Sequence, residues 1–198
     1  MKKILVMLCA TCVVICCCAC GTTHKIEKYE SDNVAESHAF AIILDEPLYE
    51  LWYGDGKYQY IVYNQAGELI AKETLKQEPQ IAGNAGGIVS VIWQVGTGAS
   101  TRCGVFYDTK DSQRSNTIQY VLCYENGVVA YGDSSQNVIV KSLLDDSVIV
   151  TLTADMFLEA AEDVPDLYID AQFSKSLDSL TVTYVSAQHT LLRQKFLL

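Results

Sequence analysis

The sequence has little positive charge and few of the residues that build catalytic or metal sites. Its 198 residues include 14 lysines and arginines against 24 acids, and 3 histidines. It contains no Gly-x-Ser-x-Gly nucleophile motif, no His-Glu-x-x-His metal motif and no EF-hand loop. Because an acidic surface repels phosphate backbones, we expect no nucleic-acid partner. No cofactor, metal site or catalytic residue is predicted.

Cysteine is scarce outside the N-terminal segment. Of the 8 cysteines, all but Cys103 and Cys123 lie at or before Cys20. In an exported protein these two could form a disulfide that closes a loop of about 21 residues, worth ~3 kcal/mol in the loop-entropy model. The alternative is a pair of small, buried, free thiols. A tetrahedral zinc site would need two further ligands.

The N-terminal segment has the layout of a secretory signal. Lys2 and Lys3 precede an uncharged apolar run that begins at Ile4, and Ala19 and Cys20 stand near its end. This segment resembles a bacterial lipoprotein signal, in which a small residue precedes a cysteine that is lipidated and becomes the mature N-terminus. The resemblance implies cleavage after Ala19 and acyl chains such as palmitate on Cys20.

An uncleaved signal anchor is the alternative, since residues 4–23 carry no charge and a membrane span needs roughly 20 residues. Both interpretations place the chain from His24 onward on the extracytoplasmic face of the cell membrane.

We expect three parts in the chain. Residues 1–19 are the signal peptide, residues 20–37 are a polar tether, and residues 38–198 are a single β-rich domain. Loss of residues 1–19 removes Lys2 and Lys3, so 14 − 2 = 12 basic residues remain against 24 acids. The acidic mature protein is expected to meet the membrane only through its lipid anchor.

From Ala39 onward, short runs rich in Val, Ile, Tyr and Thr alternate with clusters of Gly, Asn, Asp and Ser. This pattern predicts a mainly β domain, an antiparallel meander of short strands joined by tight turns. One short helix is predicted near 154–162, ending before Pro165. The candidate strands are Phe40–Leu44, Leu48–Tyr53, Tyr58–Tyr63, Leu69–Leu75, Ile88–Val95, Arg102–Tyr107, Thr117–Tyr124, Val128–Tyr131, Val138–Leu143, Val148–Leu152, Leu167–Phe173, Leu180–Val185 and Leu191–Leu197.

A weak repeat runs through these strands, because a strand followed by an Asn or Asp turn recurs about every 36–44 residues. Examples are the runs before Asn64 and Asp108. The spacing resembles the blades of a β-propeller, which are four-stranded antiparallel units of about 40 residues. Only three to four units fit, so we expect a propeller-like array, with a β-sandwich or a barrel as alternatives.

The clearest local structure is a hairpin around Asp55-Gly56, a dipeptide that favours a two-residue turn through its tolerance of positive φ. Such a turn pairs Tyr53 with Tyr58, Leu51 with Tyr60 and Tyr49 with Val62 on one face. We expect these six side chains to face the core, the alternative being an exposed aromatic platform. Trp52 and Glu50 lie on the opposite, mixed face and are the candidate ligand contacts.

These observations favour a membrane-anchored lipoprotein with a non-catalytic binding or scaffold domain. Its partner would be another envelope protein or an extracellular ligand. The alternative is a cell-envelope hydrolase that cleaves glycan or peptidoglycan with carboxylates such as Asp108 or Asp145. A concave pocket with converging acids would favour the hydrolase, whereas a filled interior and a flat aromatic patch would favour binding.

Overall fold

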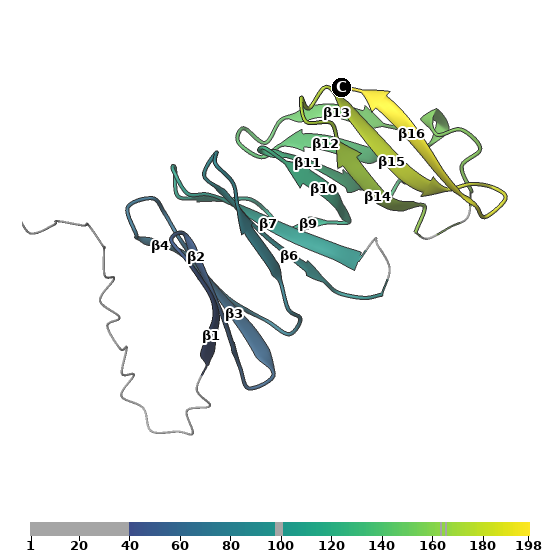
Figure 1. The fold of residues 1–198 in the computed structure, drawn as a ribbon. Coiled ribbons are helices and arrows are strands. Elements are labelled where there is room, and N and C mark those ends of the chain that lie inside the picture. Colours follow the sequence, from purple (N-terminus) through teal and green to yellow (C-terminus); the bar gives the residue numbers. More distant parts are fainter. Residues whose placement is uncertain (1–39, 98–100, 163, 165) are drawn as a thin grey trace, which may run out of the picture. The chain divides into compact units, whose positions relative to one another are not determined.

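The computed structural model describes residues 40–97, 101–162, 164 and 166–198. His38–Leu198 form one compact unit. The predicted signal peptide, the lipid-attachment residue Cys20 and the tether lie outside the described residues. The described chain is mainly β and forms four antiparallel sheets (Figure 1).

Each sheet is formed by strands that follow one another in the sequence. Sheet 1 contains β1 (Ala41–Glu46), β2 (Tyr49–Gly54), β3 (Lys57–Tyr63) and β4 (Leu69–Leu75). Sheet 2 contains β5 (Gln80–Gly83), β6 (Ile88–Gln94), β7 (Arg102–Asp108) and β8 (Gln113–Arg114), with β9 (Ile118–Gln119) also paired to β7. Sheet 3 contains β10 (Val121–Glu125), β11 (Val128–Gly132), β12 (Val138–Ser142) and β13 (Val148–Leu152). Sheet 4 contains β14 (Tyr168–Phe173), β15 (Ser179–Val185) and β16 (Leu191–Leu197).

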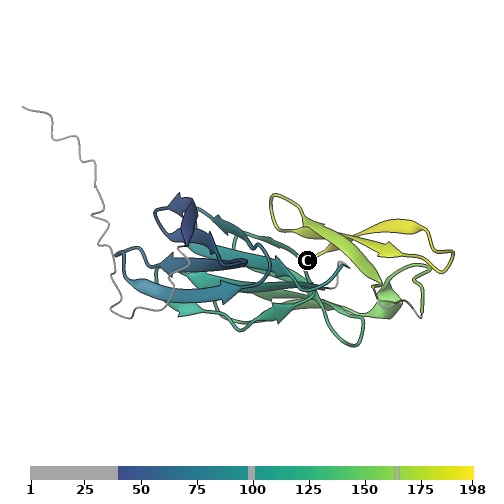
Figure 2. The same cartoon turned by 90° about the horizontal axis from the view of Figure 1, so that it is seen from below.

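The predicted meander is confirmed, and the sheets follow one another in sequence order in both views (Figure 2). Consecutive sheets pack face to face through three apolar clusters, one for each neighbouring pair. This is the propeller-like array expected from the repeat. Each sheet keeps two free edges within the described chain, so these strands form no closed barrel.

Each predicted strand has an observed counterpart, and the differences have local causes. The predicted strand Thr117–Tyr124 is divided because Tyr120 has φ +58°, a left-handed value that a strand cannot contain. Two strands, β5 and β8, were not predicted. β8 is only two polar residues, and neither strand has the alternation that marks a half-buried strand.

The predicted helix at 154–162 is wrong beyond its first turn. Only Ala154–Met156 form a helix, the short 3-10 helix η2. Phe157 leaves it with φ −92° and ψ 118° and packs its buried ring among Tyr168, Tyr184 and Phe196. The Ala161 N–H then donates to the Val185 carbonyl of sheet 4. Packing against this sheet therefore overrides the helix propensity of the segment.

The predicted hairpin register is confirmed. Asp55 and Gly56 have φ +52° and +69°, which identifies the two-residue turn with positive φ at both positions. The three predicted cross-strand pairs are present: Tyr53 with Tyr58, Leu51 with Tyr60 and Tyr49 with Val62. Leu51, Tyr60 and Val62 are buried and belong to the core, whereas Tyr53 at the turn is 43% exposed.

One five-residue turn occurs four times in the described chain, and its first copy is the Asn64 turn of the weak repeat. In each copy the side chain of residue 1 accepts a hydrogen bond from the backbone N–H of residue 5, and the N–H of residue 4 donates to the carbonyl of residue 1. Residue 4 has a positive φ, in the left-handed region. The first residue is always Asn, Asp or Ser, the types whose side chains bond to nearby backbone. The turns span 64–68, 84–88, 133–137 and 186–190.

The second of these turns also joins sheets 1 and 2. The Thr109 backbone N–H and hydroxyl donate to the Gly87 carbonyl at 2.9 and 2.7 Å, and the Gln65 N–H donates to the Thr109 carbonyl at 3.0 Å. A Cβ added to Gly87 would lie 3.0 Å from the side-chain nitrogen Nε2 of Gln65 and 3.2 Å from the hydroxyl oxygen of Thr109. Gly87 therefore allows both a positive φ and a close approach of three segments.

We predict that Gly87→Ala lowers the free energy of unfolding by about 2 kcal/mol or more. Gly67→Ala is the matched control, because Gly67 has φ +81° but nothing within 4 Å of an added Cβ. The control should lose only the ~1 kcal/mol that a left-handed alanine costs. Denaturant unfolding of both variants measures the difference, and equal losses would show that the close approach at Gly87 is unimportant.

Candidate ligand-binding pocket

A cavity of about 440 Å³ lies where sheet 3 meets sheet 4. This volume is in the range of small-molecule sites. Three segments form its walls: the start of β10, the turn between β11 and β12, and the approach to β14. The lining residues are Tyr120, Leu122, Gly132, Asp133, Ser134, Gln136, Asp166, Leu167 and Tyr168.

Tyr120 stands at the mouth of this pocket because of its backbone conformation. Its φ of +58° interrupts the strand between β9 and β10, and its carbonyl accepts the Gly132 N–H at 3.0 Å. The ring is 38% exposed although it lies between two strands. Non-glycine residues in this region of φ/ψ space cost free energy and cluster at functional sites. The pocket therefore presents one accessible aromatic ring.

Asp133 lines the pocket and holds the five-residue turn that forms one of its walls. Its Oδ1 accepts the N–H groups of Ser135 and Asn137 at 2.8 and 2.9 Å, and its Oδ2 accepts the Asn137 side-chain amide at 2.9 Å. Although partial burial opposes ionisation, these donors outweigh it and lower the pKa of Asp133. The carboxylate is thus a fixed negative charge near neutral pH.

Tyr168 closes the inner end of the pocket. It is buried, and its hydroxyl donates to the Gln136 carbonyl of the same turn. Burial raises its pKa, and the nearby charge of Asp133 raises it further. Asp166 contributes a second carboxylate, and none of the described lining residues is a lysine, arginine or histidine. The lining therefore suits a neutral or positively charged ligand with polar groups and one face for an aromatic ring.

Trp52 and Glu50, the predicted ligand contacts, lie on β2, on the face of sheet 1 that points away from sheet 2. They are far from this pocket in sequence. The structure brings them together, because Trp52 Nε1 donates to Glu50 Oε2 at 2.7 Å. Tyr63 donates its hydroxyl to Glu50 Oε1 at 3.0 Å. Burial and the charge of Glu50 raise the pKa of Tyr63 to about 12. Both side chains are half-buried, as a mixed face predicts.

Cys103 and Cys123 are free thiols in the structure, which is one of the two states that the sequence left open. They lie on β7 and β10 and are half-buried. Burial raises the pKa of both, that of Cys123 to about 12. Because the thiolate is the reactive form, both side chains are protonated and unreactive near neutral pH.

Of the two acids considered for hydrolysis, Asp108 lines a small hollow together with Asp146, and Asp145 is not among its described lining residues. Asp108 Oδ1 accepts the N–H of Lys110 at 2.9 Å beside this hollow of about 180 Å³. Asp145 accepts both the N–H and the hydroxyl of Ser147, and its pKa is lowered to about 2 chiefly by serine hydroxyls. Within the described ranges, no three His, Cys, Asp or Glu side chains are grouped to hold a metal ion.

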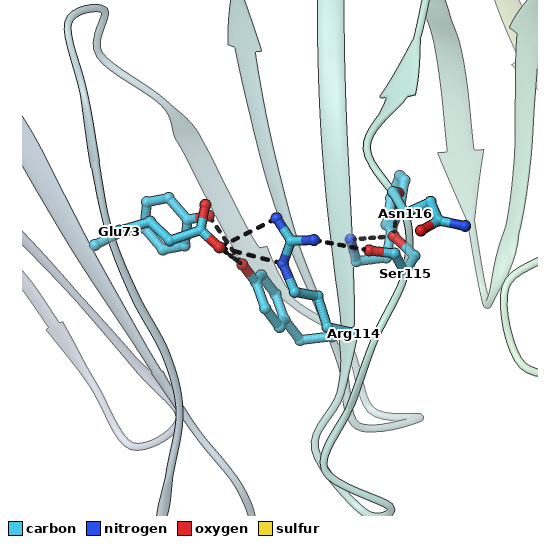
Figure 3. A network of polar contacts seen from close by, with 7 residues as sticks. Glu73, Arg114, Ser115 and Asn116 are labelled. Carbon is cyan, nitrogen blue, oxygen red and sulfur yellow. Dashed lines mark hydrogen bonds and ion pairs between the residues drawn. The ribbon is translucent and has the colours of Figure 1, made fainter.

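A polar network between sheets 1 and 2 was not predicted (Figure 3). The Tyr60 and Tyr107 hydroxyls share a hydrogen bond of 2.9 Å inside the apolar cluster. Tyr107 also donates to Glu73 Oε1, which lies 3.1 Å from Arg114 Nη2. Burial raises the pKa of both tyrosines. The network extends from the core to the half-exposed Glu73–Arg114 pair. It gives the buried hydroxyls of Tyr60 and Tyr107 hydrogen-bond partners.

No protein-family model matches the chain, and no curated protein matches its sequence. Among solved structures, a eukaryotic initiation factor aligns with 83% of this chain at 11% identity and a TM-score of 0.49, over 42% of its own length. The computationally designed Ika4 protein aligns with 81% of the chain and 93% of its own length, at 12% identity and a TM-score of 0.38. Likenesses at this level place the chain in no family.

The part of the chain that the structure describes has no helix of the length and apolarity that a membrane crossing requires.

We predict that the fold becomes less stable as the pH rises above about 10. Tyr60 and Tyr107 have raised pKa values in the folded state, so they stay protonated there when the unfolded chain loses its phenolic protons. Their stabilising effect is complete below pH 10 and is lost as the pH rises toward the folded-state pKa. Each tyrosine can lower the free energy of unfolding by at most about 1.4 kcal/mol per pH unit.

Urea unfolding at pH 9, 10 and 11 tests this. The Tyr60→Phe/Tyr107→Phe variant should lose less stability over this range than the parent, whereas a Tyr53→Phe control at an exposed ring should behave like the parent. Identical pH dependence in all three proteins would contradict the prediction.

Proposed function

We propose that this chain is a lipoprotein, held on the extracytoplasmic face of the cell membrane by acyl chains on Cys20, and that its β domain is a non-catalytic binding module. The Ala19-Cys20 signal supports the anchor. The pocket between sheets 3 and 4 carries the binding part of the proposal. Its ligand is an extracellular molecule, or a group displayed by another envelope protein, that is neutral or positively charged.

The hydrolase alternative draws some support from the pocket, because Asp133 and Asp166 are two carboxylates in one cavity. A glycosidase, however, needs one carboxyl group whose pKa is raised so that it can donate a proton. Asp133 has a lowered pKa, and both of its carboxylate oxygens accept hydrogen bonds from its own turn. Binding therefore accounts for the pocket better than hydrolysis does.

The anchor predicts a specific effect of Cys20→Ser. The parent should partition into the detergent phase of a Triton X-114 separation and incorporate radiolabelled palmitate. The variant should do neither, because a serine cannot carry the thioether-linked lipid. Cys18→Ser is the matched control and should behave like the parent. Should Cys20→Ser remain in the detergent phase, the chain would be held by an uncleaved signal anchor.

The pocket predicts which small molecules bind. In a fragment screen monitored by protein NMR, neutral and cationic fragments should shift the ring signals of Tyr120 and Tyr168, and anionic fragments should not. Tyr120→Ala should weaken this binding about tenfold without changing the fold, because the ring is exposed. Asp111→Asn, on an exposed loop outside the pocket, is the control. Fragments that bind elsewhere, or binding unaffected by Tyr120→Ala, would refute this site.

A further inference from the structure

Sheet 1 buries one face against sheet 2 and leaves the other without a partner sheet in the described chain. The strand registers place on this outer face the side chains that alternate with those packed against sheet 2. They are Ile42, Asp45, Glu50, Trp52, Gln59, Ile61, Lys72 and Thr74, of which Ile61 is buried. The outer face of sheet 1 thus combines aliphatic groups, a hydrogen-bonded tryptophan and two carboxylates.

Sheet 4, at the other end of the array, has a second face of this kind. Leu180, Val182 and Tyr184 point into the cluster shared with sheet 3. The alternating residues form the outer face of sheet 4, where Leu191 is 62% exposed and Leu197 is 81% exposed. The residues of this face are Asp170, Gln172, Thr181, Thr183, Leu191, Arg193, Lys195 and Leu197.

The two outer faces differ in charge. On sheet 1, Asp45 and Glu50 lie side by side in the register and outnumber Lys72. The raised pKa of Tyr63, caused mainly by burial and then by Glu50 and Asp45, reflects the same local excess of negative charge. On sheet 4, Arg193 and Lys195 flank Gln194 on the exposed strand β16 and outnumber Asp170, which lies opposite Thr183 on the same face. Two exposed cations on one strand are notable in a chain with 24 acids and 14 bases.

Sheet 2, in the middle of the array, shows how sheet faces pack when neighbouring sheets cover them. Both faces of β6 are buried, one in the cluster with sheet 1 and the other in the cluster with sheet 3. Sheet-on-sheet packing is therefore the contact on which this fold is built. An outer face with aliphatic and aromatic side chains is suited to the same contact.

We propose that the outer face of sheet 1 docks on the outer face of sheet 4 of a second copy of this chain. Asp45 and Glu50 of one copy then face Arg193 and Lys195 of the next, and Trp52 supplies the central aromatic contact. The contact is heterologous, since two different faces meet, and the pair keeps one free face of each kind for further copies.

The interface is small. A sheet of three to four strands of six to seven residues measures roughly 20 by 20 Å, so the two copies together bury about 800 Å². This is the range of weak, transient association. Confinement of the copies to one membrane would raise their effective concentration and favour the contact.

Sedimentation equilibrium of the purified full chain in density-matched detergent tests the proposal. The parent mass should rise with protein concentration. Asp45→Lys, which makes the sheet 1 face basic, and Arg193→Glu/Lys195→Glu, which makes the sheet 4 face acidic, should each raise the dissociation constant at least about tenfold. An equimolar mixture of the two variants should associate again, because each altered face then meets a face of opposite charge.

Asp111→Lys is the matched control, with the same charge change on an exposed loop, and should associate like the parent. Circular dichroism should show the parent fold in every variant, as all the altered side chains are exposed. A monomeric parent at all concentrations would overturn the proposal. So would equal weakening by Asp45→Lys and Asp111→Lys, or a mixture that stays monomeric.

Discussion

The fold depends on one constraint, which is that an antiparallel sheet with apolar side chains on both faces must be covered on both. Sheet 2 shows it most clearly, because Val89 and Val91 of β6 are buried on one face and Ile88 and Ile92 on the other. Such a sheet cannot stand alone in water. Sheets 1 and 3 cover it, and sheet 4 covers sheet 3 in turn. Only the two end sheets keep a polar or mixed face.

Much of this fold could be predicted from local sequence signals. Asp55-Gly56 determines the hairpin of β2 and β3, because two consecutive positive φ angles suit few other dipeptides and fix the register of the pairs in this hairpin. The Asn64 and Asp133 turns likewise mark strand ends through side chains that bond to their own backbone. The helix near 154–162 could not be excluded in this way, since the packing of Phe157 on sheet 4 depends on residues far along the chain.

The candidate sites could be predicted less well. Trp52 and Glu50 were found because a hairpin register is local information, and their hydrogen bond follows from positions on one face two residues apart. The pocket, in contrast, unites Tyr120 and Tyr168, which are brought together only when sheet 4 packs on sheet 3. The left-handed backbone of Tyr120 has no signature in the sequence. The Tyr60–Tyr107 hydrogen bond was missed for the same reason, because it joins two sheets.

The assembly of each sheet from strands that lie close together in the sequence has a consequence for folding during synthesis. A chain that is made N-terminus first can complete sheet 1 before sheet 2 has appeared, and each later sheet can form on the exposed face of the one before. Such sequential contacts lower the loop-closure cost of folding. Sheet 4 would be the last of the four sheets to assemble, so the pocket at its junction with sheet 3 would form only after the other three sheets.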